Sequence, residues 1–389
     1  MLYELRKQDY GRVQRLFKDL EWNLITRAVI DGTSPGRVYV DRVDDPRTAF
    51  MCTVEGYYVA GDDSNAAFNS SLNKLLLERI FVGDTVRKDE TDVAIGFHPD
   101  SWTERMPAVF QGRSPLITTR RHYVCTEVKS SQWRDHIPTG FQVHRISDEL
   151  LRTPGLEVPD HVTEWMTTNW GSVPAFMKRG FGFCTVYGSR IVSWSVADCV
   201  SADACEIGIH TLEAHRRQGL ATLTATAAVD HALASGLRQV GWHCDEYNLG
   251  SIRVAEKAGF RLERKYVQYY ACANAAHHLA ETAQAHFRAK RYRDAIECYR
   301  RFFATPPDAL PGWLREVLPQ ELGTHYFRVA YAHAALGEAA AALDYLERAV
   351  AHGWSSMDFL LGCKEFASMH GTPQWNRILG KIQKKLGDH

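Results

Sequence analysis

The sequence predicts an α+β protein with a mixed β-sheet, followed by an all-α region built from pairs of helices. Three observations lead to this fold class. Strand-like alternation recurs between residues 181 and 211, an Ala/Thr/Leu-rich helix is expected over residues 220–235, and strand patterns cease after residue 273. Because 389 residues exceed one ordinary hydrophobic core, we expect two or three domains.

The first 140 residues mix helical and strand-like segments, and they form the first predicted domain. Turn signals such as Ser34-Pro35-Gly36 separate these segments. Amphipathic helices are expected over residues 9–29 and 65–82, and strands over residues 37–41, 48–59 and 91–97.

A clearer pattern occupies residues 141–272, the second predicted domain. Strands are expected over residues 181–187 and 191–198, and Gly188-Ser189-Arg190 joins them as a hairpin. A third strand over residues 206–211 precedes the long helix, which Gly236 ends. A strand over residues 239–244, a helix over 249–258 and strand up to residue 272 complete this predicted domain.

Residues 273–389 form the third predicted domain, an all-α array. Apolar residues recur there at helical spacing in successive segments with short turns between them, which is typical of helical repeats. The expected helices cover residues 275–289, 292–303, 321–336, 338–352, 356–369 and 373–386, and an insertion is expected near residues 304–319.

Composition excludes several classes of function. Lys plus Arg equals Asp plus Glu at 46 each, so no overall field favours nucleic acid or an anionic membrane. The nine cysteines are scattered without a CxxC pair, so we expect neither a metal site nor a disulfide framework. The N-terminus has no hydrophobic signal core and no long apolar stretch occurs, which predicts a cytoplasmic protein without membrane spans.

The chemistry is expected in the stretch CEIGIHTLEAHRRQGLATLTATAAVDHALASG. Here a strand runs into the loop Arg216-Arg217-Gln218-Gly219-Leu220-Ala221, and this loop opens directly into a helix. The first N–H groups of a helix lack intrahelical partners and lie at the positive end of its dipole. A glycine and a small residue let the backbone approach a bound anion closely, so the loop is a candidate phosphate site.

The strand, the R-x-x-G-x-A loop and the helix resemble the coenzyme A-binding motif of the GNAT superfamily of N-acetyltransferases. Asn248-Leu-Gly-Ser251 followed by Arg253-Val-Ala-Glu-Lys-Ala-Gly259-Phe260 is similar to the next motif of that superfamily. The resemblance implies a GNAT acyltransferase fold that uses acetyl-CoA, or another acyl-CoA, as co-substrate. It also implies cofactor contacts from the strand end, the loop and the next helix, by Ile209, Thr211, Leu212, Arg216, Arg217, Gln218, Gly219, Leu220, Ala221, Thr222 and Asn248.

Some of these side chains have simpler alternatives. Arg216 and Arg217 are equally well explained as solvated surface charges, and Asn248 as an ordinary N-cap.

The resemblance further implies that Glu206 deprotonates the amine through water. A salt-bridged or edge-exposed glutamate is the alternative, since a carboxylate is costly to bury unpaired. His210 lies on the same strand face if the strand is regular, and it is a second candidate base. Asp198 is a weaker one.

Many relatives place a tyrosine, the proton donor to the departing thiolate, where this chain has Ala255. Ser251 or one of several tyrosines, Tyr247, Tyr266, Tyr269 and Tyr270, replaces it, or no side chain acts as the acid. Cys244 is expected to be structural, and the adjacent His243 is expected to point to the opposite face.

The two flanking regions also resemble known arrangements. Residues 1–140 look like the degenerate first half of a tandem GNAT protein, in particular bacterial ones with a Gly-Arg-Val-Tyr-Val-Asp strand, and such a half shapes the acceptor cleft. An independent adaptor domain is the alternative. The C-terminal array resembles tetratricopeptide repeats, which bind partner proteins; a helical buttress or a dimerisation surface is the alternative.

The predicted function is therefore transfer of an acyl group, taken as acetyl, from coenzyme A to a primary amine of a small molecule, peptide or protein. One alternative is a scaffold or sensor that binds acyl-CoA without turnover. The other is an aminoacyltransferase that uses aminoacyl-tRNA, which requires a continuous basic surface beside the cleft. Nucleic acid and membrane partners are not otherwise expected.

Overall fold

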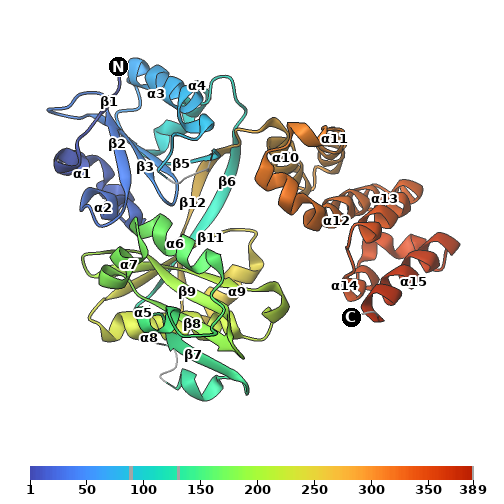
Figure 1. The fold of residues 1–389 in the computed structure, drawn as a ribbon. Helices are drawn as coiled ribbons and strands as arrows, with labels where there is room; N and C mark the ends of the chain where they lie inside the picture. Colours follow the sequence, from blue (N-terminus) through green and yellow to red (C-terminus); the bar gives the residue numbers. More distant parts are fainter. Residues whose placement is uncertain (87–90, 129–131, 388–389) are drawn as a thin grey trace. The chain divides into compact units, whose positions relative to one another are not determined.

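The computed structural model describes residues 1–86, 91–128 and 132–387 (Figure 1). The chain forms two compact units, Met1–Ala271 and Cys272–His389, which are described separately. Within the described residues, no helix is both long enough and apolar enough to cross a membrane.

One twelve-stranded sheet runs through the whole first unit, in the order β1-β2-β3-β4-β5-β12-β6-β11-β10-β9-β8-β7. Its strands are β1 (Tyr3–Glu4), β2 (Gly36–Val40), β3 (Thr48–Thr53), β4 (Tyr57–Gly61), β5 (Val93–His98), β6 (Leu116–Cys125), β7 (Phe141–Arg145), β8 (Gly182–Tyr187), β9 (Arg190–Ser201), β10 (Ala204–Thr211), β11 (Gln239–Asp245) and β12 (Arg261–Ala271).

The strand order has an internal two-fold pattern. The neighbours β4 and β5 are parallel in the first half, and β10 and β11 are parallel in the second. The last strand of each half, β6 or β12, pairs with the fifth strand of the other half, and the two exchanged strands pair with each other at the centre. The sheet of the second half is therefore completed by β6, which comes from the first 140 residues.

The central position of β6 was not predicted from the sequence. Its residues Leu116–Cys125 read LITTRRHYVC, and the run of Thr, Arg and His hides the apolar alternation. The strand predicted over residues 48–59 is two antiparallel strands, β3 and β4, with a turn between them, and the other predicted strands of the first unit agree with the structure to within a few residues at their ends.

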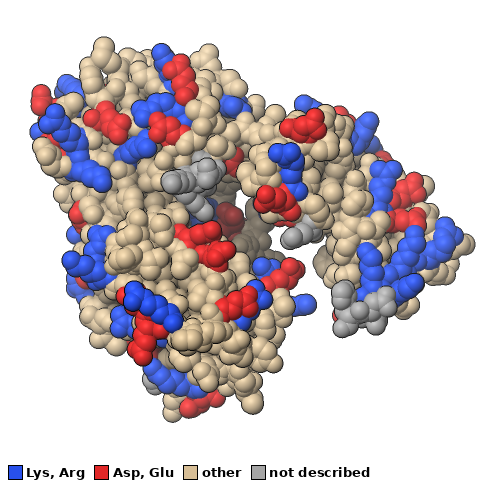
Figure 2. All heavy atoms as spheres, in the orientation of Figure 1, with Lys and Arg blue, Asp and Glu red and all other residues tan. Residues whose placement is uncertain are grey.

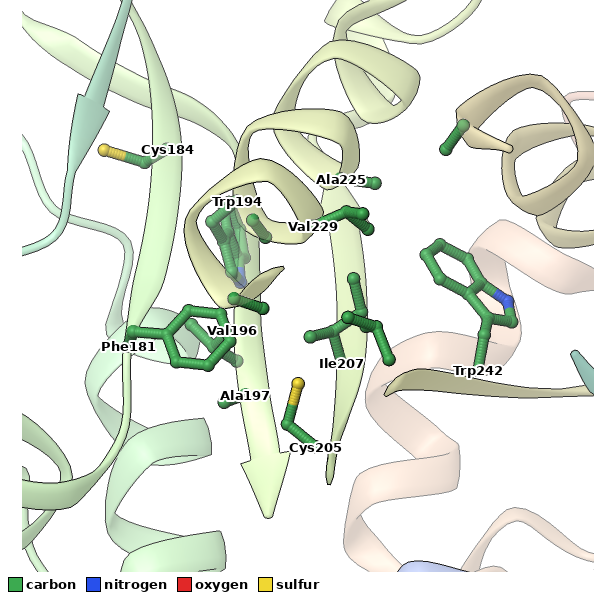
Figure 3. Close-up of a cluster of buried hydrophobic side chains, with 14 of the residues drawn as sticks. Phe181, Cys184, Trp194, Val196, Ala197, Cys205, Ile207, Ala225, Val229 and Trp242 are labelled. Carbon is green, nitrogen blue, oxygen red and sulfur yellow. The ribbon is translucent and has the colours of Figure 1, made fainter. Parts of the chain in front are cut away.

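Small residues let the long helix α8 (Leu220–Ala234) lie closely against the second half of the sheet. Its alanines and threonines are buried along most of its length, and Ala225, Ala228 and Val229 are fully buried. Figure 3 shows Ala225 and Val229 facing the strands that carry Val196 and Ile207. Such burial of apolar surface fixes the start of α8 relative to the end of β10.

Other helices of the first unit cover the sheet around this core. They are α1 (Gln14–Phe17), α2 (Leu24–Ile30), α3 (Ala66–Glu78), α4 (Met106–Val109), α5 (Asp148–Leu151), α6 (Asp160–Trp170), α7 (Val173–Arg179) and α9 (Leu249–Ala258). The short helix α2 packs with β2–β4 in the first core and also contacts β9 and β10 of the second half. The two halves thus share packing as well as strands.

The second unit is all-helical. It contains α10 (Ala275–Arg288), α11 (Tyr292–Phe303), α12 (Gly312–Ala335), α13 (Ala339–Ala351), α14 (Met357–Leu361) and α15 (Pro373–Gly387). Consecutive helices from α10 to α13 pack on one another, and α15 packs on α13. Helix α12 begins nine residues before the predicted residue 321, so part of the expected insertion is helical despite Pro319.

Candidate active site and cofactor cleft

The parallel strands β10 and β11 pair over three residues, from Ala204 with Gln239 to Glu206 with Gly241. Beyond Glu206, β10 continues to Thr211 and pairs with β9 on one side, while no described strand pairs with it on the other. A strand edge of this kind presents unpaired backbone N–H and C=O groups. The gap gives the second half an opening in its sheet.

Two adjoining cavities occupy this opening. The inner cleft, of about 500 Å³, lies around Glu206, His243, Trp165 and Asp198. The loop cleft, of about 660 Å³, lies around the residues from Arg216 to Thr222 and the start of α9. Four residues line both cavities, and they are Ile209, His210, Asn248 and Ser251.

Most of the predicted cofactor residues line the loop cleft. These are Ile209, Thr211, Arg216, Arg217, Gly219, Leu220, Ala221, Thr222 and Asn248. Leu212 does not line it, because its N–H bonds to the Val192 carbonyl in the sheet and its side chain packs against the core. Gln218 lines a smaller neighbouring cavity of about 300 Å³ beside Trp133.

The start of α8 has the geometry expected of an anion site. Gly219 is its N-cap with φ +83°, a left-handed conformation that favours glycine. Leu223 N is the first to donate within the helix, to Gly219 O, so the N–H groups of Leu220, Ala221 and Thr222 precede the first intrahelical bond.

Four basic side chains surround that helix start, and they are Arg216, Arg217, Arg253 and Lys257. Arg216 also donates from Nε to the Thr211 carbonyl at 3.2 Å, which fixes part of its side chain at the rim of the cleft. Lys257 was not singled out from the sequence, although it belongs to the second quoted motif. Four cations and an aligned helix dipole favour a polyanion such as a diphosphate.

Glu206 lies on the floor of the inner cleft, and its side chain is 6% exposed. Its Oε1 accepts hydrogen bonds from the Leu24 backbone N–H at 2.7 Å and from His243 Nε2 at 3.0 Å. Burial by itself raises the pKa of Glu206, but His243, His122 and the Leu24 N–H together hold it below its ordinary value. The carboxylate is therefore buried and paired, and it stays ionised at neutral pH.

His243 lies on the same face of the sheet as Glu206, and opposite to Cys244 as predicted. Its other nitrogen, Nδ1, lies 3.0 Å from the Tyr266 hydroxyl. No role could be predicted for this histidine from the sequence, because its partner Glu206 is 37 residues away and on another strand.

His210 occupies the boundary between the two cavities. Its ring stacks on Trp194 with centroids 4.6 Å apart and contacts His161 at 4.9 Å. Burial, followed by the nearby His161 and Arg216, lowers the pKa of His210 to about 4. The imidazole is therefore neutral near pH 7.

The start of α9 holds two more predicted residues. Asn248 accepts a hydrogen bond from Ser251 N at 3.0 Å, so its side chain caps the helix while lining both cavities. Ser251 Oγ accepts from Trp242 Nε1 at 3.0 Å, which leaves its hydroxyl proton to be donated elsewhere. Ala255 is fully buried, and its methyl side chain cannot act as an acid. Burial raises the pKa of Cys244, so its thiol lacks the features of an activated nucleophile.

The candidate tyrosines do not line the two cavities. Tyr266 and Tyr269 line a separate cavity of about 850 Å³ beside β5, and Tyr270 donates to Asp92. Tyr247 is 54% exposed. Of the groups considered as proton donors, Ser251 is the one that the structure brings to the clefts.

The first half contributes directly to the inner cleft through Val54, Glu55 and Arg120. These residues come from the β3–β4 turn and from the exchanged strand β6. These residues could not be predicted from the sequence, because they are distant in the chain from every recognised motif.

Helix α6 covers the other side of the inner cleft. Trp165 donates to Asp198 at 2.7 Å and lies directly over Gly208, where an added Cβ would come within 2.0 Å of its ring. His161 and Glu164 of the same helix also line the cleft. Only a glycine at this point of β10 lets the indole lie over the strand.

His122, Glu206 and His243 bring ligand-type atoms within 4.8 Å of one another. However, the two imidazole rings lie nearly parallel, 10° apart in plane and 4.4 Å between centroids. A metal ion binds in the plane of an imidazole ring, so one ion cannot lie in both planes in this arrangement. The geometry is that of a stacked pair in a hydrogen-bond network.

The equivalent opening is closed in the first half. There β4 and β5 remain paired from Tyr57 to Ala60, next to the end of β4 at Gly61. Within this pairing Tyr58 lies opposite Gly96, and Tyr58 is buried.

The charge distribution bears on the predicted nucleic-acid alternative. In Figure 2, basic and acidic side chains of the described residues are interspersed over the visible face of the first unit, and the basic ones do not merge into a continuous surface there. A tRNA-dependent reaction would require a continuous basic surface beside the cleft.

Three known proteins are similar to this chain. An uncharacterized N-acetyltransferase of Bacillus subtilis (strain 168), YdfB, is 27% identical over 271 residues, which cover 69% of this chain and 98% of that protein. A GCN5-related N-acetyltransferase-like protein from Streptococcus suis 89/1591 has a similar solved structure, with TM-score 0.50 and 21% identity over 68% of this chain and 98% of that one. A tandem GNAT protein from the clavulanic acid biosynthesis pathway aligns with TM-score 0.45 and 12% identity, over 70% and 98% of the two chains.

The family comparison covers most of the first unit. Residues 14–269 match the GNAT acetyltransferase family, and this segment is more than half of the chain. The matched segment includes the strand opening, the Gly219 loop and the Glu206 network. The chain therefore belongs to the GNAT acetyltransferase family.

Proposed function

We propose that this protein transfers an acetyl group from coenzyme A to a primary amine of a small molecule, peptide or protein. The observation that carries the proposal is the unpaired edge of β10 between two clefts, with the cation-rich start of α8 on one side and buried Glu206 on the other. The loop cleft would hold the diphosphate, and residues 207–211 would pair with the pantetheine arm in the manner of an added strand.

In this proposal the amine enters the inner cleft and loses a proton to Glu206 through a water molecule. The neutral amine then attacks the thioester carbonyl, so that a C–N bond forms and the C–S bond breaks. After the attack the nitrogen must lose a second proton, and Ser251, whose hydroxyl proton is not used in its bond with Trp242, would take up that proton as it gives its own to the leaving thiolate. The main contributions of the chain are proximity, amine deprotonation and hydrogen bonding at the reacting carbonyl.

The full-length chain should be tested by thiol release from acetyl-CoA over a panel of primary amines, with CoA binding measured in parallel by calorimetry. Glu206→Gln should keep CoA binding and lower kcat by about 10²–10⁴-fold, the usual contribution of a general base. The amide oxygen can still accept from Leu24 and His243, so the fold should survive.

Glu256→Gln is the matched control, because Glu256 is exposed on α9 and lines neither cleft. Binding of CoA without thiol release for any amine would instead support the acyl-CoA sensor. Absence of CoA binding would reject both functions.

A further inference from the structure

The side chains around Glu206 form one connected network that draws on both halves of the tandem. Glu206 is on β10 and His243 on β11 of the second half, whereas Leu24 opens α2 of the first half. The contact between Leu24 N and Glu206 Oε1 joins residues that are 182 positions apart.

Tyr266 determines how His243 can be protonated. A phenol carries its proton up to about pH 10, and burial raises the pKa of Tyr266 further. If its hydroxyl donates to His243 Nδ1, the imidazole proton is on Nε2, where it donates to Glu206. The Tyr266 hydroxyl thereby selects the tautomer that suits an ionised carboxylate.

Aromatic packing holds this histidine in place. The His243 ring stacks on His122, whose Nδ1 lies 2.9 Å from Glu263 Oε2. Trp22, two residues before Leu24, contacts both imidazoles and the Tyr266 ring, with centroids 4.7–6.1 Å away. The first half thus supplies a ring against the histidine and a backbone donor to the carboxylate.

We propose that His243 and Tyr266 are positioning residues for Glu206, and that the segment Trp22–Leu24 of the first half completes this arrangement. The first half is then part of the active site and not merely a support for the second. The kinetic effects of this network rest on the proposed function. The hydrogen bonds and ring contacts of the network do not depend on that function.

The direct test follows the ionisation of Glu206 by ¹³C NMR of glutamate-labelled full-length protein, with its signal assigned from Glu206→Gln. His243→Ala should raise the apparent pKa of Glu206, because a donor to the ionised form is removed. Tyr266→Phe should raise it by less. Tyr269→Phe is the matched control, since Tyr269 lies on the same strand and lines the same cavity without reaching His243.

The contribution of the first half is isolated by two substitutions at one position. Leu24→Pro removes the N–H, and a proline is tolerated at the first residue of a helix. A proline also requires a non-helical residue before it, and Asn23 meets this requirement with an extended-type ψ of 96°. Leu24→Ala keeps the N–H and removes more of the side chain than the proline does, so it controls for the loss of packing. A larger rise of the Glu206 pKa in Leu24→Pro than in Leu24→Ala is the expected result.

Kinetics provide the second measurement. The acid limb of kcat/KM should move to higher pH in His243→Ala and Leu24→Pro, and kcat should fall about three- to tenfold in Tyr266→Phe with an unchanged KM for acetyl-CoA. His243→Gln should recover part of the loss, because its amide still donates. If Glu206 titrates identically in wild type, His243→Ala and Leu24→Pro, the inference is overturned. If those shifts appear in a protein without turnover, the proposed function fails and the positioning network stands.

Discussion

Replacing Gly219 by alanine tests the cofactor loop most directly. Gly219 has φ +83°, and an added Cβ would meet no atom of the chain within 4 Å. The substitution therefore creates no clash, and its cost is the left-handed backbone, about 1–2 kcal/mol for a residue with a side chain. An exposed loop can avoid this cost in the free protein by relaxing to negative φ.

Binding must then restore the original loop shape, so the strain appears in the affinity. A cost of about 1–2 kcal/mol corresponds to a rise of roughly 5- to 30-fold in the Kd for CoA. Isothermal titration calorimetry with CoA measures this change, and thermal unfolding without ligand should be little affected.

Gly188→Ala is the matched control for this prediction. Gly188 also has positive φ (+58°) and open space around its Cβ position, but it lies in the β8–β9 hairpin and lines neither cleft. Its substitution should leave the Kd for CoA unchanged. A Gly219→Ala variant that binds CoA within about twofold of wild type would refute the assignment of the loop.

Three further predictions follow from the described geometry. Gly208→Ala should displace Trp165 from its bond with Asp198 and destabilise the fold by about 1–3 kcal/mol. Steady-state kinetics should show a higher KM for the amine, and calorimetry an unchanged affinity for CoA. Burial raises the pKa of Cys244, so intact-mass measurements after incubation with acetyl-CoA should reveal no acylated Cys244, and Cys244→Ser should remain active. Burial and the adjacent His243 lower the pKa of His122 to about 4. The unfolded chain therefore binds more protons between about pH 4 and 6.5, and stability should fall as the pH drops through that window, less steeply in His122→Gln.

Much of the second half could be predicted because its signals are local. The strand end, the glycine at the start of α8 and the capped start of α9 are each written in a few consecutive residues. Backbone preferences and helix-end chemistry act over that range, so the sequence predicts them without knowledge of the fold. The helical nature of the C-terminal unit follows likewise from its periodicity, while its relation to tetratricopeptide repeats stays a prediction.

The tertiary structure decided what surrounds Glu206. The sequence offered a candidate carboxylate, but the donors to its Oε1 come from Leu24 and from His243, and the cleft includes Arg120 from an exchanged strand. These contacts depend on which strands pair at the centre of the sheet, and strand pairing is set by the burial of distant surfaces against one another rather than by neighbouring residues. The loop was therefore determined by local sequence, and the environment of the proposed base by the exchange of β6 and β12.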